Sequence, residues 1–393
     1  DYEKGLPTNE AVEQAINSSD RLVKKNAVRM LCKSTLPKTV LLPIIDRLVY
    51  DNDNAVRANA IIGAGRLRYT EYAPLLGKRF AGTAHLGEAA ACLRTLAKLD
   101  SAAVYALVTG RFDTSRMESM VRLCSGWLER NDFEKSSYQR VIDKLSGESP
   151  LGAKLACLPL VASWKIREAE DVLLNIVVSS TLDETEVSGI SHTLTSIDKP
   201  STGVKAYNLL RQRWQWLSQP RRKARCQALL QIIIDCDYQP ALESIQELLQ
   251  PGQPATTLDL TLEVFLRRRN NSVVWDRTRK ALSGNQAKFF LEALKPSILI
   301  LTGYRQEEVR QKAFKLYCYS FKPGDTPALE SLIPTFLRSR SLSDQKAAVA
   351  IISDLDLKNL APDLCGLLRE TIDASLRSVI ERTLRDPLQY QCN

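Results

Sequence analysis

The chain has 393 residues, a formal net charge of +9 and a hydrophobic content of 44%, which is ordinary for a folded protein. No run of apolar residues approaches the ~18 that a transmembrane helix needs, so no membrane span is predicted. At ~100–200 residues per compact domain, the chain is long for a single core. It begins with Asp rather than Met, so we expect that a segment before it was processed or left out.

Residues 51–67 predict a helix with one narrow packing face. Residues 51–54 are all Asp or Asn, whose side chains accept hydrogen bonds from the free N–H groups of a helix start. Apolar or small residues then follow at helical spacing, at Val56, Ala60, Ala64 and Leu67. Arg57 and Arg66 lie off this stripe and are expected to reach water.

A small residue recurs on predicted helices along the whole chain. The positions are Ala27, Ala60, Cys92, Cys124, Cys157, Ser191, Cys226, Thr261, Ala313 and Ala347. Their separation is roughly 32–35 residues, except for a longer gap between Thr261 and Ala313, and such a period is typical of a stacked repeat array. Neighbouring units must stack, because no single unit can bury its own apolar face.

A second apolar helix is expected before many of these positions. The predicted segments are 40–49, 72–80, 169–178, 240–249, 327–337 and 361–368. Prolines are expected in the first turn of these helices, where the backbone has no N–H bond to lose, at Pro43, Pro74, Pro240, Pro327 and Pro362. Each unit is therefore predicted to be a helix, a turn, a second helix and a turn.

The pattern D-x-x-V-R-x-x-A at Asp53, Val56, Arg57 and Ala60 resembles the HEAT family, and residues 308–313 repeat it in a weaker form. The period alone also suits tetratricopeptide and ankyrin repeats, but the Trp, Gly-Tyr and Pro pattern of tetratricopeptide units is missing. The resemblance implies an all-α, right-handed α-solenoid of about ten or eleven HEAT-like helix pairs. It implies no single function.

We expect four segments along the chain. Residues 1–18 form an N-terminal cap with a short helix, and residues 19–197 hold the first half of the repeats. Residues 198–385 hold the second half, with an irregular unit or an inserted helix near 262–300. Loops are predicted at 198–203 and 251–257. Residues 386–393 are expected to be a frayed tail after the last helix.

The nine cysteines and two histidines argue against a metal site. Several cysteines occupy the small-residue position of the repeat, where cysteine acts as a small apolar residue. No pair has C-x-x-C spacing, so we expect no metal and no cofactor. An odd number of buried thiols favours a reducing compartment, and a cytoplasmic location is expected.

Residues 201–280 are the most basic part of the chain for their length, and residues 131–200 are acidic. Two segments of the basic part combine cations with tryptophan. The candidate binding residues are Arg211, Arg213, Trp214, Trp216, Arg221, Arg222, Lys223, Arg225, Arg267, Arg268, Arg269, Trp275, Arg277, Arg279 and Lys280. Because equivalent helices of a solenoid line one surface, these residues could join into one basic strip. The alternative is that the cations form solvated helix faces and that the tryptophans pack between units.

The favoured function is a non-catalytic scaffold or adaptor that binds a protein partner with an acidic surface. The alternative is a nucleic-acid-binding module, because Arg and Lys neutralise phosphates and Trp stacks on bases. Two enzymatic branches of HEAT-like proteins are weaker alternatives: the alkylpurine DNA glycosylases, on the strength of Trp275 and Asp276, and the bilin lyases. No catalytic residue is predicted, since no phosphate loop, zinc motif or nucleophile elbow occurs in the chain.

Overall fold

The computed structural model of the chain describes residues 9–31, 37–132, 135–271, 288–321 and 327–392. Within these ranges, the side chains of residues 9–12, 218, 220–221, 268–271, 288 and 327 are not described. The described residues form helices, turns and loops and no β-strand. They divide into two compact units, residues 1–172 and 173–393, whose boundary lies within helix α12 (Ala169–Ser179).

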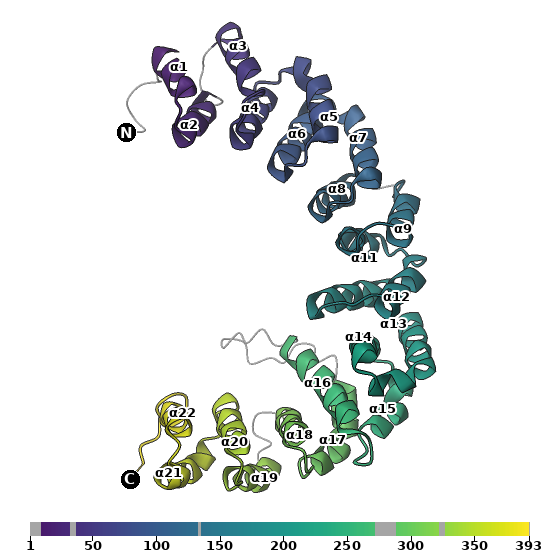
Figure 1. The fold of residues 1–393 in the computed structure, drawn as a ribbon, viewed down its shortest axis with the longest axis vertical. Helices are drawn as coiled ribbons and strands as arrows, with labels where there is room; N and C mark the ends of the chain where they lie inside the picture. Colours follow the sequence, from purple (N-terminus) through teal and green to yellow (C-terminus); the bar gives the residue numbers. More distant parts are fainter. Residues whose placement is uncertain (1–8, 32–36, 133–134, 272–287, 322–326, 393) are drawn as a thin grey trace. The chain divides into compact units, whose positions relative to one another are not determined.

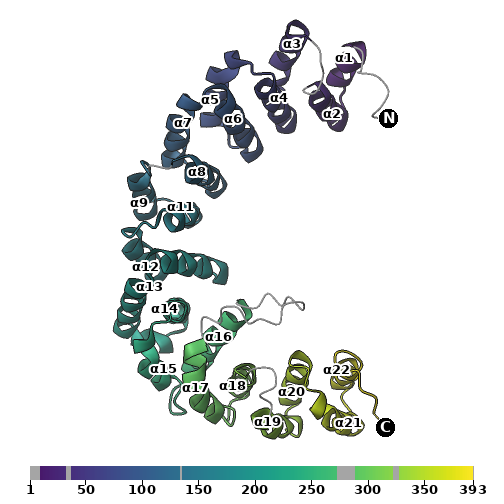
Figure 2. The ribbon, with the colours of Figure 1, turned by 180° about the vertical axis from the view of Figure 1, so that it is seen from behind.

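The first unit consists of paired helices (Figure 1). Its helices are α1 (Asn9–Asn17), α2 (Arg21–Leu31), α3 (Lys38–Leu48), α4 (Asn54–Arg66), α5 (Ala73–Gly82), α6 (Leu86–Leu99), α7 (Ser101–Thr114), α8 (Glu118–Asn131), α9 (Tyr138–Ser146), α10 (Leu151–Leu155) and α11 (Leu158–Trp164), with a 3-10 turn η1 (Thr70–Tyr72). Helices α2, α4, α6 and α8 pack side by side in one layer, and α5 packs against α7 in the other. The two layers are visible in both views (Figures 1 and 2).

The second unit continues the same alternation. Its helices are α13 (Glu184–Gln212), α14 (Pro220–Asp235), α15 (Leu242–Leu248), α16 (Ala255–Asn271), α17 (Lys288–Leu301), α18 (Glu307–Tyr319), α19 (Pro327–Leu337), α20 (Leu342–Asp354), α21 (Ala361–Glu370) and α22 (Ala374–Arg385), with 3-10 turns η2 (Trp214–Ser218), η3 (Gln239–Ala241) and η4 (Lys358–Leu360). Helices α14, α16, α18, α20 and α22 form one layer. Helix α15 packs on α17, and α19 packs on α21.

The small-residue period marks the buried centre of one helix layer, as predicted. All ten positions from Ala27 to Ala347 are buried, and eight of them have no exposed surface. Nine of them lie on helices that pack against another helix of their layer, and Cys157 lies in the turn between α10 and α11. At these contacts a larger side chain would hold the backbones apart. The prediction of stacked helix pairs is confirmed, and the number of units stays a prediction.

The loop expected at residues 198–203 is wrong. Only Asp198 leaves the helical conformation, with φ −154° and ψ 91°, and α13 runs through both sides of this kink. The Asp198 carboxylate accepts the Ser201 N–H at 3.2 Å, and Pro200 needs no hydrogen-bond acceptor in the first turn that follows. The change of direction is therefore made at one residue, Asp198. Gly203 in the helix that follows allows Tyr238 to pack closely, since a Cβ added to Gly203 would lie 2.8 Å from the Tyr238 Cβ.

Two further details of the helices differ from expectation. Pro43 lies in the middle of α3 rather than in its first turn, because α3 already begins at Lys38. The loop predicted at 251–257 ends early, since α16 starts at Ala255. Of the irregular unit or inserted helix expected near 262–300, the structure describes the end of α16, up to Asn271, and α17 from Lys288 onward. Residues 272–287 lie outside the described residues, so this expectation stays a prediction.

The C-terminal tail is held in place, which contradicts the prediction that it frays. Helix α22 ends at Arg385, as expected from Asp386 and Pro387. Leu388 is buried, and the Tyr390 N–H donates to the Leu384 carbonyl at 2.8 Å. A disulfide joins Cys392 of the tail to Cys365 of α21.

Cys365 and Cys392 lie outside the small-residue positions of the repeat, and their disulfide was not predicted. The cysteines of the repeat position, Cys92, Cys124, Cys157 and Cys226, are buried thiols. Burial raises the pKa of the first three to about 12 and that of Cys226 to about 11. The Cys365–Cys392 disulfide removes part of the basis for expecting a reducing compartment.

Several helices of the packed layers end with a residue in the left-handed region. Arg68, Lys165, Asp237 and Asp356 have φ between 50° and 55°. The N–H of each following residue donates to a carbonyl five positions back, as Tyr69 does to Ala64 at 3.0 Å. This is the Schellman arrangement, in which glycine is the usual residue because it has no Cβ.

We therefore expect Arg68→Gly to stabilise the protein by about 0.5–1 kcal/mol, because glycine relieves the left-handed backbone strain of an exposed arginine. The control is Arg94→Gly, at an exposed position inside α6, which should cost about 1 kcal/mol. Urea denaturation of the two variants measures both changes. Equal destabilisation by both glycines would contradict the role assigned to Arg68.

Candidate functional site

The turn between α13 and α14 holds the first group of predicted binding residues. Helix α13 ends at Gln212, and the Trp216 N–H donates to the Arg213 carbonyl at 2.7 Å to form η2. Pro220 then opens α14, since a proline in the first helical position loses no hydrogen bond. This tight turn places Trp214 and Trp216 at the surface, each half-buried.

Two arginines lie over the indole of Trp216. The Arg213 guanidinium carbon is 5.3 Å from the ring centroid, and that of Arg222 is 4.8 Å away. Both distances fall within the range of a cation–π contact. Arg213 also donates to the Leu209 carbonyl at 3.3 Å, whereas Arg222 is exposed. The turn thus arranges two positive charges around one aromatic ring.

Arg211 adds a third charge at the same turn. It is exposed, and its guanidinium carbon lies 5.8 Å from the centroid of the Tyr207 ring. Among the residues that the structure describes, Arg211, Arg213 and Arg222 form no ion pair with a carboxylate. We name Arg211, Arg213, Trp214, Trp216 and Arg222 the Arg/Trp cluster.

The position of Arg222 is unfavourable for helix stability. It lies in the first turn of α14, which contains no acidic residue. The N-terminal end of a helix carries a partial positive charge, so cations there are repelled and anions are attracted. The cluster is therefore a site of positive potential with exposed donors and a flat aromatic surface beside them.

Two other predicted cations have their charge compensated. Lys223 lies 3.3 Å from Asp259 of α16, and Arg267 lies 2.9 Å from Glu263 on the same helix. Lys312 of α18 bridges the two carboxylates, at 2.6 Å from Asp259 and 2.8 Å from Glu263. This network ties α14, α16 and α18 together, so Lys223 and Arg267 are structural contacts.

The pKa values in this network follow its charges. Burial alone would raise the pKa of Glu263, but Lys312 and Arg267 outweigh it and hold that pKa below its usual value. Burial alone would lower the pKa of Lys312, and the two carboxylates raise it instead. Glu263 and Lys312 therefore stay charged at neutral pH, and the ion pairs of the network leave little free positive charge for a partner.

The remaining predicted residues divide into two sets. Arg225 donates to the Ser179 carbonyl at 3.0 Å. The side chains of Arg221, Arg268 and Arg269 are not described, and Trp275, Arg277, Arg279 and Lys280 lie outside the described residues. The structure thus brings Arg213, Trp216 and Arg222 of the first predicted segment together, while Lys223, Arg225 and Arg267 contact other groups. Whether any of these residues binds a partner stays a prediction.

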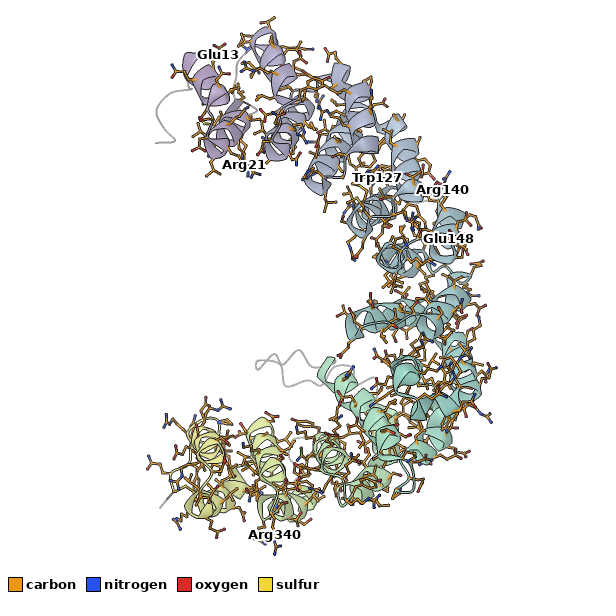
Figure 3. The ribbon with its side chains drawn as sticks, viewed as in Figure 1. Glu13, Arg21, Trp127, Arg140, Glu148 and Arg340 are labelled. Carbon is orange, nitrogen blue, oxygen red and sulfur yellow. A yellow bond between two sulfur atoms is a disulfide. The ribbon has the colours of Figure 1, made fainter. Side chains whose placement is uncertain are left out.

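The other tryptophans differ in burial. Trp164 is buried at the end of α11, as a packing role requires, while Trp127 of α8 is only half-buried (Figure 3).

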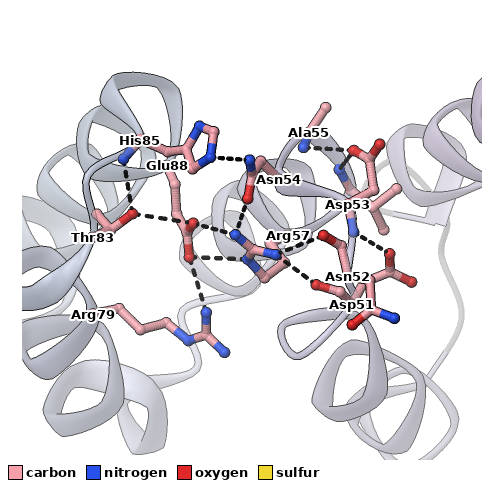
Figure 4. Close-up of polar contacts among 11 residues, drawn as sticks. Asp51, Asn52, Asp53, Asn54, Ala55, Arg57, Arg79, Thr83, His85 and Glu88 are labelled. Atoms are coloured by element: carbon pink, nitrogen blue, oxygen red, sulfur yellow. Dashed lines mark hydrogen bonds and ion pairs between the residues drawn. The ribbon is translucent and has the colours of Figure 1, made fainter.

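A polar cluster that the sequence did not reveal joins two consecutive units of the first half. Arg57 of α4 is 2.8 Å from Glu88 of α6, and Arg79 of α5 is 2.9 Å from the same carboxylate (Figure 4). Arg57 also donates to the carbonyls of Asp51 at 2.8 Å and Asn52 at 3.0 Å, in the turn before its own helix. The expectation that Arg57 reaches water is wrong, while Arg66 is exposed as predicted.

Glu88 is the centre of this cluster, which we call the Glu88 cluster (Arg57, Arg79, Thr83 and Glu88). Its side chain is only 2% exposed, and those of Arg57 and Arg79 are 16% and 19% exposed. Burial alone would raise the pKa of Glu88, but the two arginines outweigh it and keep that pKa below its usual value. The carboxylate is therefore ionised at neutral pH despite its burial.

The second unit contains an equivalent contact. Arg310 of α18 lies 2.8 Å from Asp344 of α20 and donates to the Tyr304 carbonyl at 3.2 Å. Arg57 and Arg310 are the arginines of the two HEAT-like patterns at residues 53–60 and 308–313, and their acidic partners follow 31 and 34 residues later. That spacing, close to one repeat, is the signal by which the pairs could have been found.

The outer helices of the first unit carry another repeated contact. Arg111 of α7 donates to the Thr83 carbonyl at 2.7 Å, after the end of α5. Lys144 of α9 donates to the Ser115 carbonyl at 2.7 Å, after the end of α7. Arg140 of α9 also pairs with Asp113 of α7. These cations satisfy free carbonyls of the preceding helix, so they stabilise the stacking of units.

No protein-family model matches the chain, and no curated protein matches its sequence. Solved structures do match. A Kap95p structure with RanGDP shares 12% identity at a TM-score of 0.47, over 98% of this chain and 55% of that one. Kap121p bound to Pho4p shares 14% identity at a TM-score of 0.39, over 95% of this chain and 40% of that one. A chain from a structure on the interaction between cadherin and β-catenin shares 12% sequence identity at a TM-score of 0.30, over 97% of this chain and 94% of that one.

These structures are α-solenoids of the HEAT and armadillo type. The described residues of this chain form stacked helices and no strand, so the predicted all-α solenoid class is confirmed by its own helix packing. The chain spans about half the length, or less, of the two karyopherins that it matches. Among the described residues, no helix of this solenoid is long and apolar enough to cross a membrane.

Proposed function

We propose that this solenoid is a non-catalytic scaffold or adaptor that binds a protein partner with an acidic surface at the Arg/Trp cluster. One observation carries the proposal: Arg213 and Arg222, which have no carboxylate partner among the described residues, lie over the half-buried Trp216 at the positive end of α14. Arg211, also without such a partner, lies over Tyr207 just before the same turn. This arrangement does not serve helix stability, because α14 would be more stable with acidic residues in its first turn.

The chemistry of the cluster favours carboxylates on the partner. A guanidinium binds a carboxylate through two parallel N–H bonds, and such charge-assisted bonds are stronger than neutral ones. Trp and Arg are also the residue types that contribute most to binding energy in protein interfaces. The positive potential of the cluster would steer an acidic partner toward it and make the association rate depend on salt.

The proposal is tested by removing only the exposed charges of the cluster. The variant Arg211→Ala with Arg222→Ala is compared with Arg66→Ala with Arg130→Ala, which removes two exposed arginines from the first unit. The probe is a labelled peptide rich in Asp and Glu, titrated by fluorescence anisotropy at several salt concentrations. We expect the cluster variant to bind at least tenfold more weakly than the wild type, and the control variant to bind within about twofold.

A labelled DNA duplex and a labelled single strand serve as competing probes in the same series. Binding of DNA that is tighter than binding of the peptide, with a steep salt dependence and a loss in the cluster variant, would replace the acidic protein by a nucleic acid. Equal loss in both variants would show that only the overall charge matters. That result, or no binding of any probe at low salt, would overturn the assignment of the cluster.

A further inference from the structure

The C-terminal helix pair carries the one disulfide among the described residues, Cys365–Cys392. Cys365 lies on α21 and is 6% exposed, whereas Cys392 lies in the exposed tail beyond α22. The bond spans 27 residues and closes a loop that contains most of α21, all of α22 and the tail. It therefore ties together both helices of the last described pair.

The described contacts of this pair come from the preceding helices and from the tail. In a stacked array each pair is stabilised by its own contacts and by the pairs beside it. Helix α22 packs on α20 and α21, and no described helix follows it. The tail supplies contacts in that place, because Leu388 is buried and the Leu388 and Tyr390 N–H groups donate to the Thr383 and Leu384 carbonyls.

A reductant in solution can reach this disulfide, because Cys392 is exposed. The other cysteines that the structure describes are not accessible in this way. Cys92, Cys124, Cys157, Cys226, Cys236 and Cys318 are all buried. Burial keeps the thiols of the first four protonated at neutral pH, since it raises each pKa well above 7, and only a thiolate takes part in disulfide exchange. Exchange is thereby directed to Cys392, which is exposed.

From this placement we propose that the Cys365–Cys392 disulfide is a reducible latch. It determines whether the α21–α22 pair and its tail are well ordered or open locally. The reductant is a dithiol. Its thiolate attacks Cys392 Sγ, the bond between the two sulfurs breaks, and Cys365 Sγ leaves as a thiolate that takes up a proton. The second thiol of the reductant then displaces Cys392 as a thiol, so two electrons pass to the protein and the reductant becomes a disulfide. Without the cross-link, the tail and α22 open locally while the rest of the array stays folded.

The first measurement is a thiol count on the full chain after exposure to a mild oxidant and unfolding in denaturant. The latch predicts seven reactive thiols out of nine cysteines, since two are cross-linked. Nine thiols would overturn the proposal. Peptide mapping without reductant then checks that the missing pair is Cys365 with Cys392.

The second measurement is hydrogen exchange on the folded chain with and without a dithiol. We expect reduction to accelerate exchange at least tenfold in α21, α22 and the tail, and to leave α18 and α20 within about twofold. Cys392→Ser should match the reduced wild type with or without the dithiol, and Cys124→Ala should respond as the wild type does. Unchanged exchange in α22 after complete reduction would overturn the proposal, and so would uniform acceleration along the whole chain.

Discussion

Glu88→Gln should destabilise the first unit by about 2–3 kcal/mol at pH 7. The substitution keeps the shape of the side chain but removes the negative charge that two half-buried arginines share. Removing one partner of a buried ion pair typically costs 3–5 kcal/mol, and partial exposure of Arg57 and Arg79 places this case below that range. Denaturation followed by circular dichroism measures the change.

The control for this variant is Glu118→Gln. Glu118 pairs with Arg122 on the surface of α8, and both side chains are more than half exposed. Such a pair contributes less than about 0.5 kcal/mol, so the control should be close to the wild type. Equal effects of the two substitutions would show that the Glu88 cluster does not hold the units together.

The effect of Glu88→Gln should also depend on pH. The folded protein lowers the pKa of Glu88, so its contribution is complete above the unfolded value of about 4.3 and is lost as the pH falls through the folded value. The stability difference between wild type and variant should therefore be largest near neutral pH and shrink in acid. A difference that stays constant down to pH 3 would contradict the ion-pair explanation.

Ala60→Leu should cost about 1–3 kcal/mol, because α4 packs closely against α2, α3 and α6. Ala60 has no exposed surface, so three added carbons would push these helices apart. The matched control is Ala58→Leu, two residues earlier on the same helix, where the side chain is half-exposed. Thermal unfolding of both variants compares the two positions, and an unchanged Ala60→Leu variant would mean that this face of α4 tolerates bulk.

The stacked-helix fold could be predicted because close packing imposes a local rule. Wherever two helices of one layer meet, the central residue must be small, and this requirement recurs once per unit whatever the other residues are. The kink at Asp198 escaped prediction because one capping carboxylate and one proline replace a whole loop there. The disulfide between Cys365 and Cys392 depends on the path of the tail, which passes back beside α21, and no local sequence pattern predicts that path.

The candidate site was only partly predictable, because composition does not show which charges are already paired. Lys223 and Arg222 are neighbours in the sequence, yet Lys223 meets Asp259 of the next unit and Arg222 meets an aromatic ring. Arg267 likewise finds Glu263 one helical turn away. The predicted basic strip thus includes two kinds of cation: those paired with carboxylates, and the arginines of the Arg/Trp cluster, which have no such partner among the described residues. Only the fold shows to which kind a given cation belongs.

The ion pairs that bridge neighbouring units give the array a direction along the chain. Arg57 finds its acid in the unit that follows, and Arg310 does the same. A helix pair cut out of this protein, or moved to another place in it, would leave behind a buried arginine or take along a buried acid without its partner. Single units can therefore be duplicated, deleted or exchanged only where no ion pair crosses the boundary between two units. The solenoid can change its length only in steps that keep each of these arginines together with its acidic partner.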